Sequence, residues 1–171
     1  MNEQSGAAMS YLDNSIVATH LHTVELDPAA SEAKSRRATT AILRWLFRED
    51  EGYDVVRGDD RGDSVPDFVV LKMECGPGGP PFAYDFMMVE CTKAGVSWDE
   101  AYDRCICHCS NTYNRSRQVY AMVQVGMDVQ FYKWEEGSTL TPLSGTLHQR
   151  DDVQGVMERA GYLKAHPFPF V

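Results

Sequence analysis

Two acidic residues and one lysine lie beside predicted strands in the middle of the chain. Asp67 stands at the start of an apolar run, Glu90 stands near the end of a later one, and Lys93 follows three residues after Glu90. Carboxylate oxygens are the ligands that Mg²⁺ prefers, and a bound Mg²⁺ polarises a phosphate and lowers the pKa of an attacking water. A nearby lysine stabilises the developing negative charge. If the two strands are antiparallel neighbours, the three residues predict a Mg²⁺ (or Mn²⁺) site at one edge of a sheet.

The elements that would position these residues follow from the hydrophobic pattern. Apolar residues recur at three- and four-residue spacing where we expect helices, and form short runs where we expect strands. The predicted order is helix, three strands, helix, two strands and helix, over residues 28–50, 53–57, 65–71, 82–92, 98–113, 118–125, 128–134 and 152–165. This order indicates an α/β fold with a mixed central sheet of about five strands and helices on both faces.

Two motifs in this frame resemble the signature of a known superfamily. Val65-Pro66-Asp67, a glycine-rich turn and Val89-Glu90-Cys91-Thr92-Lys93 are similar to the PD-(D/E)XK pattern of the restriction-endonuclease-like fold. The flanking helices match the αβββαβ order of that family, over about residues 28–135. The resemblance implies that Asp67 and Glu90 are metal ligands, that Lys93 is the catalytic lysine, and that the chain is a metal-dependent nuclease or nuclease-like domain acting on DNA or RNA. The alternative is a catalytically inactive domain of the same fold that binds a protein partner.

The spacing between Glu90 and Lys93 departs from the family pattern. In the family the acidic residue and the lysine are two positions apart, so both lie on one face of a strand. Here they are three apart, and on a regular strand Thr92 shares the face of Glu90 while Lys93 points away. A β-bulge, or a strand that ends at Thr92, would bring Lys93 back to the site. Otherwise the lysine is missing and the domain does not cut.

Two further residues are considered for the same site. Some family members add a glutamate from the first helix, for which Glu32 is the nearest candidate, although its helical phase lies away from the apolar stripe and favours a solvated glutamate in the first turn. Gln124, on the strand after the second helix, could also face the site, but an ordinary strand glutamine is the preferred interpretation.

The charge and the cysteines restrict the partners and cofactors. The chain has 16 Lys and Arg against 25 Asp and Glu, and its formal net charge of -9 opposes a broad nucleic-acid surface, so a cation and a local groove would have to carry the contact. Nucleic acid and a protein partner both remain candidates, and a homodimer is compatible with the sequence. Arg115, Arg117 and Lys133 are basic positions that could touch phosphates.

The cysteines suggest two alternatives to a magnesium site. Zinc bound by Cys105, Cys107 and Cys109 with Cys91 as a fourth ligand is the first, but a helix puts only Cys105 and Cys109 on one buried face, which favours core packing. A thiol nucleophile at Cys91 or Cys107 is the second, and neither has a histidine partner at a recognised spacing.

The chain reads as a single domain over residues 15–171 that follows a disordered or loosely ordered tail over residues 1–14. It contains neither an apolar run long enough for a membrane helix nor a secretory signal pattern, and five cysteines are an odd number. These features predict an intracellular protein, cytoplasmic or nuclear, without a membrane partner. In this setting Arg61-Gly62-Asp63 is interpreted as a tight turn and not as an integrin ligand.

Overall fold

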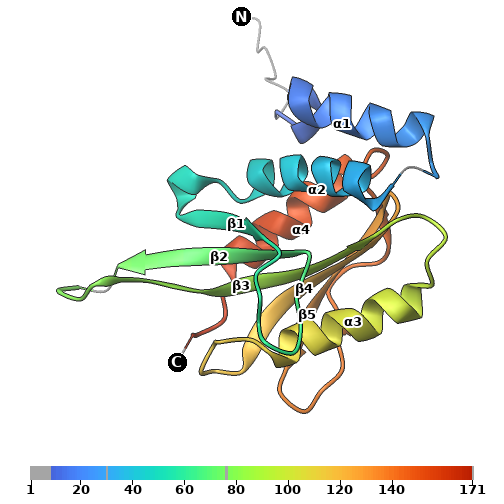
Figure 1. Cartoon of the computed structure of the whole chain (residues 1–171). Helices are drawn as coiled ribbons and strands as arrows, with labels where there is room; N and C mark the ends of the chain where they lie inside the picture. The colour runs from blue at the N-terminus through green and yellow to red at the C-terminus, as the bar shows by residue number, and fades with distance from the viewer. Residues whose placement is uncertain (1–8, 30, 76, 171) are drawn as a thin grey trace, which may run out of the picture.

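The computed structural model describes residues 9–29, 31–75 and 77–170, and in these residues a mixed seven-stranded sheet carries helices on both faces (Figure 1). The strand order is β1-β2-β3-β4-β5-β6, and β7 also pairs with β5. β1 to β3 form an antiparallel meander, β4 runs parallel to β3, and β5 is antiparallel to β4. The strands are β1 (Tyr53–Arg57), β2 (Phe68–Cys75), β3 (Pro81–Thr92), β4 (Gln118–Val125), β5 (Asp128–Glu135), β6 (Thr141–Pro142) and β7 (Leu147–His148).

The predicted α/β class and mixed sheet are therefore confirmed. The helix predicted over residues 28–50 is shorter and spans Glu32–Leu46, the strand predicted over residues 65–71 lies later at Phe68–Cys75, and some elements were not predicted at all. β6 and β7 are two residues long each and raise the strand number above the expected five, because such short edge strands carry no periodic pattern. A helix over Ser15–Leu26 was not predicted. It begins after Asn14, whose side-chain oxygen accepts hydrogen bonds from the backbone N–H groups of Ile16 and Val17.

Two hydrophobic cores lie on the two faces of the sheet. α2 (Glu32–Leu46) and α4 (Val153–Ala165) pack against one face, α1 (Ser15–Leu26) lies on the outer side of α2, and α3 (Trp98–Ser110) packs against the other face (Figure 1). β3 contributes to both cores in alternation, since Met87, Val89 and Cys91 belong to the first and Met88 to the second. This burial on both faces explains the apolar run of the central strand.

The tail predicted over residues 1–14 lies only partly within the described residues. Residues 1–8 lie outside them. Tyr11–Asp13 form a 3-10 helix, and the Tyr11 side chain is fully buried, where its hydroxyl donates to the carbonyl oxygen of Gln149. Tyr11 thus packs into the core on the α2 face.

A buried ion pair fixes the β1–β2 loop to the central strand. Both guanidinium Nη atoms of Arg61 donate to the Asp85 carboxylate at 2.7 and 2.8 Å, and each side chain is almost fully buried. The Thr112 hydroxyl and the Tyr113 backbone N–H donate to the same carboxylate at 2.7 and 2.8 Å. Burial lowers the pKa of Arg61, but the hydrogen bonds and charge of Asp85 outweigh it and raise this pKa overall. Arg61 is therefore a core residue, which supports the interpretation of the tripeptide as a turn.

Removing one member of this pair leaves the other as an uncompensated buried charge. We expect Asp85→Ala to lower the free energy of unfolding by about 3–5 kcal/mol. Asp63→Ala, which removes an exposed carboxylate from the same loop, serves as the matched control and changes it by less than about 0.5 kcal/mol. Urea denaturation followed by circular dichroism measures both. Equal losses in the two variants would contradict this role of the pair.

None of the helices within the described residues is both long and apolar enough to cross a membrane.

Candidate functional site

The predicted site residues meet at the rim of the sheet where β2 begins and β3 ends. Asp67 directly precedes β2, and the antiparallel register pairs Phe68 with Val89, so that Asp67 comes next to Glu90. β3 and β4 are parallel, so both end at this rim. The expected arrangement of antiparallel neighbours is therefore present. Whether the Asp67 and Glu90 carboxylates can share a metal ion depends on the directions and partners of their side chains.

The Asp67 carboxylate is held from the α2 side. Its Oδ1 accepts a hydrogen bond from Nη2 of Arg36 at 2.5 Å, and its Oδ2 accepts one from the backbone N–H of Cys91 at 2.8 Å. Arg36 also lies 3.5 Å from Glu32, one helical turn earlier. Glu32 therefore reaches Asp67 only through Arg36. The three side chains form an acid–guanidinium–acid chain at the end of the sheet.

The Glu90 carboxylate is held from the α3 side. Its Oε1 lies 2.8 Å from Nε of Arg104, and its Oε2 lies 2.9 Å from Nε2 of His108. Glu90 and His108 are both buried, whereas Arg104 is partly exposed. Since α2 and α3 cover opposite faces of the sheet, the two motif carboxylates are each neutralised by a different helix.

Lys93 lies beyond the end of the central strand. β3 ends at Thr92, which is fully buried, and Lys93 is exposed with no side-chain hydrogen bond or ion pair to any described residue. The strand does contain a bulge, but it lies between Met87 and Asp85, and the pairing with β4 is unbroken from Met87 to Thr92. Because the strand is regular here, Thr92 and not Lys93 shares the strand face of Glu90.

The electrostatic state of Asp67 reflects its crowded surroundings. Burial raises the pKa of Asp67, the backbone N–H of Cys91 lowers it, the charge of Glu90 raises it and Arg36 lowers it, with a net increase above the ordinary value. The two carboxylates thus repel each other, although each has its own partner. A cation between them would relieve this repulsion.

The remaining candidates have structural surroundings. Gln124 is buried beneath α2, where its Oε1 accepts from the Thr39 hydroxyl at 2.8 Å and from Nε2 of Gln149 at 3.0 Å, while its Nε2 donates to the carbonyl oxygen of Gly126 at 2.8 Å. This amide therefore connects three segments of the chain. Arg117 donates to the carbonyl oxygens of Ser110 and Thr112, which makes it a loop brace.

The cysteines do not converge on one point. Cys91 belongs to the core under α2, and Cys105 and Cys109 belong to the core under α3, on the other side of the sheet. Cys107 is exposed, and no cysteine is in a disulfide. Burial raises the pKa of the Cys91 thiol to about 12, so that this thiol stays protonated at neutral pH. This geometry supports neither the zinc site nor the nucleophile.

A metal ion has no ready-made set of ligands at this rim. Across the described residues, no group of three or more His, Cys, Asp and Glu side chains is placed to hold one. The two carboxylates that would bind Mg²⁺ are occupied by Arg36 on one side and by Arg104 and His108 on the other. As they stand, these residues do not fit a shared cation.

Comparisons with known proteins add no relative. Neither a protein-family model nor a curated protein nor a solved structure matches this chain.

Sequence reasoning missed the partners of the two carboxylates. His108 was not considered for the site, yet it is buried against Glu90. The spacing carried a signal, since Arg104 and His108 are four residues apart and share one face of a helix. Arg36 had a similar signal, one turn after Glu32, but pairing over 31 residues with Asp67 follows only from the tertiary structure.

The coupling between the two carboxylates predicts a measurable pKa change. Because the charge of Glu90 raises the pKa of Asp67, Glu90→Gln should lower the pKa of Asp67. NMR titration of the Asp67 carboxyl carbon measures it, and Glu158→Gln, which removes an exposed charge on α4, should leave it unchanged. An unchanged Asp67 pKa in Glu90→Gln would contradict the coupling.

The raised pKa also fixes the sign of the pH dependence of stability. Between the ordinary pKa of an aspartate and the raised value, the folded state holds a proton that the unfolded chain has lost. The contribution of Asp67 to stability therefore falls as the pH rises through this window and is constant above it.

Proposed function

We propose that this chain is a nucleic-acid-binding domain of the PD-(D/E)XK type. Its motif carboxylates stabilise the packing of α2 and α3 on the sheet and do not take part in cleavage of nucleic acid. The observation that carries the proposal is the separate neutralisation of Asp67 by Arg36 and of Glu90 by Arg104 and His108. Metal-dependent hydrolysis needs oxygen ligands that are free to share one ion.

The position of Thr92 supports the same conclusion. In the motif that the sequence resembles, a lysine two residues after the acid shares its strand face. The regular pairing of β3 with β4 assigns this place to Thr92, and a hydroxyl cannot supply the positive charge that stabilises a developing oxyanion.

The topology supports the assignment of the fold type. A helix, an antiparallel three-stranded meander, a second helix and a strand parallel to the third follow one another, which is the αβββαβ order of the restriction-endonuclease-like family. Arg57 lies at the end of β1 next to the rim of Asp67 and Glu90, is exposed and has no side-chain partner among the described residues, so it is available to a phosphate.

The proposal predicts binding without cleavage. We expect labelled DNA and RNA oligonucleotides to bind with an affinity that falls as salt rises, and to remain intact in the presence of Mg²⁺ or Mn²⁺. Electrophoretic mobility shift and denaturing gels measure binding and cutting on the same samples. Asp67→Asn and Glu90→Gln serve as controls for contaminating nucleases, and wild type should show no cutting beyond theirs.

A metal-dependent nuclease is the second candidate, and the register that places Asp67 next to Glu90 at one rim favours it. In this case Asp67 and Glu90 would be the residues that hold Mg²⁺, in place of their contacts with Arg36, Arg104 and His108, and the ion would supply a Lewis acid for phosphodiester hydrolysis. Cutting by the wild type that disappears in both variants would establish this candidate and overturn the first. A sample that neither binds nor cuts any oligonucleotide would refute both and leave the protein-binding scaffold.

A further inference from the structure

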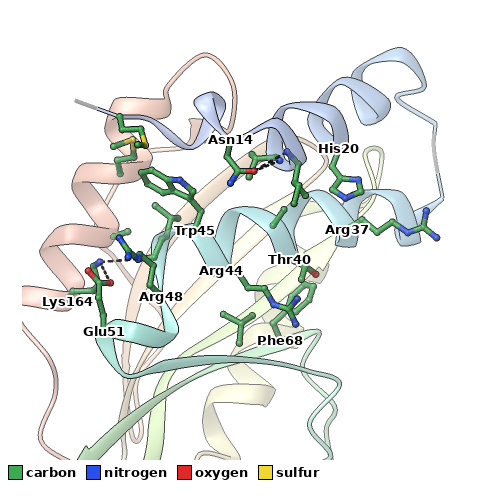
Figure 2. Close-up of a pocket in the computed structure, with 18 of the residues that line it drawn as sticks. Asn14, His20, Arg37, Thr40, Arg44, Trp45, Arg48, Glu51, Phe68 and Lys164 are labelled. Atoms are coloured by element: carbon green, nitrogen blue, oxygen red, sulfur yellow. Dashed lines mark hydrogen bonds and ion pairs between the residues drawn. The ribbon is translucent and has the colours of Figure 1, made fainter. Parts of the chain in front are cut away.

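A groove with a basic lining lies beside the Asp67 rim and has no role in the site described above. It has a volume of about 1090 Å³ and is formed by residues of α1, α2, β1 and α4 (Figure 2). Its described lining contains five cationic side chains and one acidic one, Glu51, in a protein with a net charge of -9. The cations are Arg37, Arg44, Arg48, Arg57 and Lys164.

Three of these five cations have no partner among the described residues. Arg48 pairs with Asp50, and Lys164 lies 2.8 Å from Glu51. Arg37, Arg44 and Arg57 make no side-chain hydrogen bond or ion pair within the described part of the chain, and all three are exposed. Acidic residues outnumber basic ones across the protein, yet these three arginines have no acidic partner. Their unpaired charge gives the groove a local positive potential, which favours an anionic ligand.

The spacing and the aromatic lining favour a nucleic-acid strand as this ligand. Arg37 and Arg44 are seven residues apart on α2, about 10.5 Å along the helix axis, so they can contact separate phosphates of one strand. Trp45 also lines the groove, where its side chain points away from that of Arg44 (Figure 2). It is partly exposed, so the exposed part of its ring can contact a base.

The shape of the groove favours a single strand over a duplex. Proteins read a duplex by inserting a helix or a β-ribbon into its groove. Here the binding surface is concave and is bordered by α1 on one side and by α4 on another, and its volume is near the upper limit of pockets for small ligands. It has room for a few unstacked nucleotides.

The groove also leads to the Asp67 rim. Phe68, which follows Asp67, and Arg57, which pairs with Phe68 across β1 and β2, both line it. Thr40 lines it as well, and its hydroxyl donates to the carbonyl oxygen of Arg36, the residue that holds Asp67. A strand in the groove therefore ends next to the motif carboxylates.

We infer that the α1–α2–α4 groove binds single-stranded nucleic acid, with phosphates on Arg37 and Arg44 and a base on Trp45. This inference rests on the proposed function and names its substrate class and contact surface.

The test uses fluorescence anisotropy of the full chain with a labelled 20-nucleotide single strand and with the corresponding duplex. We expect wild type to prefer the single strand. Arg37→Ala/Arg44→Ala should weaken its binding on the order of tenfold to a hundredfold at low salt and reduce the slope of log K against log salt by about 1.4, because two phosphate contacts are lost. Both arginines are exposed and unpaired, so thermal unfolding of the double variant should match wild type.

Arg115→Glu is the matched control, since Arg115 is exposed, basic and outside the groove. It should bind like wild type. Tryptophan fluorescence should also be quenched by the single strand in wild type and quenched less in Trp45→Leu.

The outcomes separate this inference from the proposed function. Wild-type binding that persists in Arg37→Ala/Arg44→Ala but is lost in Arg115→Glu would overturn the groove and leave the proposed function intact. Equal or tighter binding of the duplex would overturn the single-strand assignment. If wild type binds neither ligand, both the groove and the proposed function fail.

Discussion

A carboxylate that leaves water needs a cation or several N–H donors, and three carboxylates of this sheet meet that requirement in three different ways. Asp85 takes the guanidinium of Arg61 and thereby anchors the β1–β2 loop. Glu90 takes Arg104 and His108 from α3, and Asp67 takes Arg36 from α2. Each acid ties a different segment to the sheet, so charge neutralisation fixes how the layers are placed around β2 and β3.

The same neutralisation bears on the chemistry of the rim. Acids that are compensated by arginines from opposite faces are stable without a metal ion, whereas a nuclease centre keeps its carboxylates available to one ion. Burial is the main cause of the raised pKa of Asp67, and the charge of Glu90 adds to it.

The distribution of charge reconciles an acidic protein with the polyanionic ligand that we propose. A net charge of -9 opposes long-range attraction to nucleic acid. Contact with a polyanion is therefore favourable only where basic side chains are concentrated and acidic ones are few. The α1–α2–α4 groove has this composition. Its cations are spread over α2, β1 and α4 and the loop after α2, so no basic run in the sequence marks it.

The sequence by itself determined the class of fold and the order of its elements. Hydrophobic periodicity located β1, β3, α3, β4, β5 and α4 to within a few residues, because a two-sided central strand and one-sided helices leave clear patterns. It failed at α1 and at the two short edge strands, where the apolar signal is weak or the element is too short. It also brought Asp67 and Glu90 to one rim, since antiparallel neighbours place the start of one strand beside the end of the other.

Only the tertiary structure decided which partners these acids have. Arg36 is 31 residues from Asp67 along the chain, and its contact depends on how α2 crosses the sheet, which no local pattern encodes. Whether Thr92 or Lys93 shares the strand face of Glu90 likewise depended on a bulge after Glu90. The bulge instead lies earlier in β3, between Met87 and Asp85. Side-chain alternation can be read from a sequence, but packing between distant elements sets where the alternation is interrupted and which charges meet.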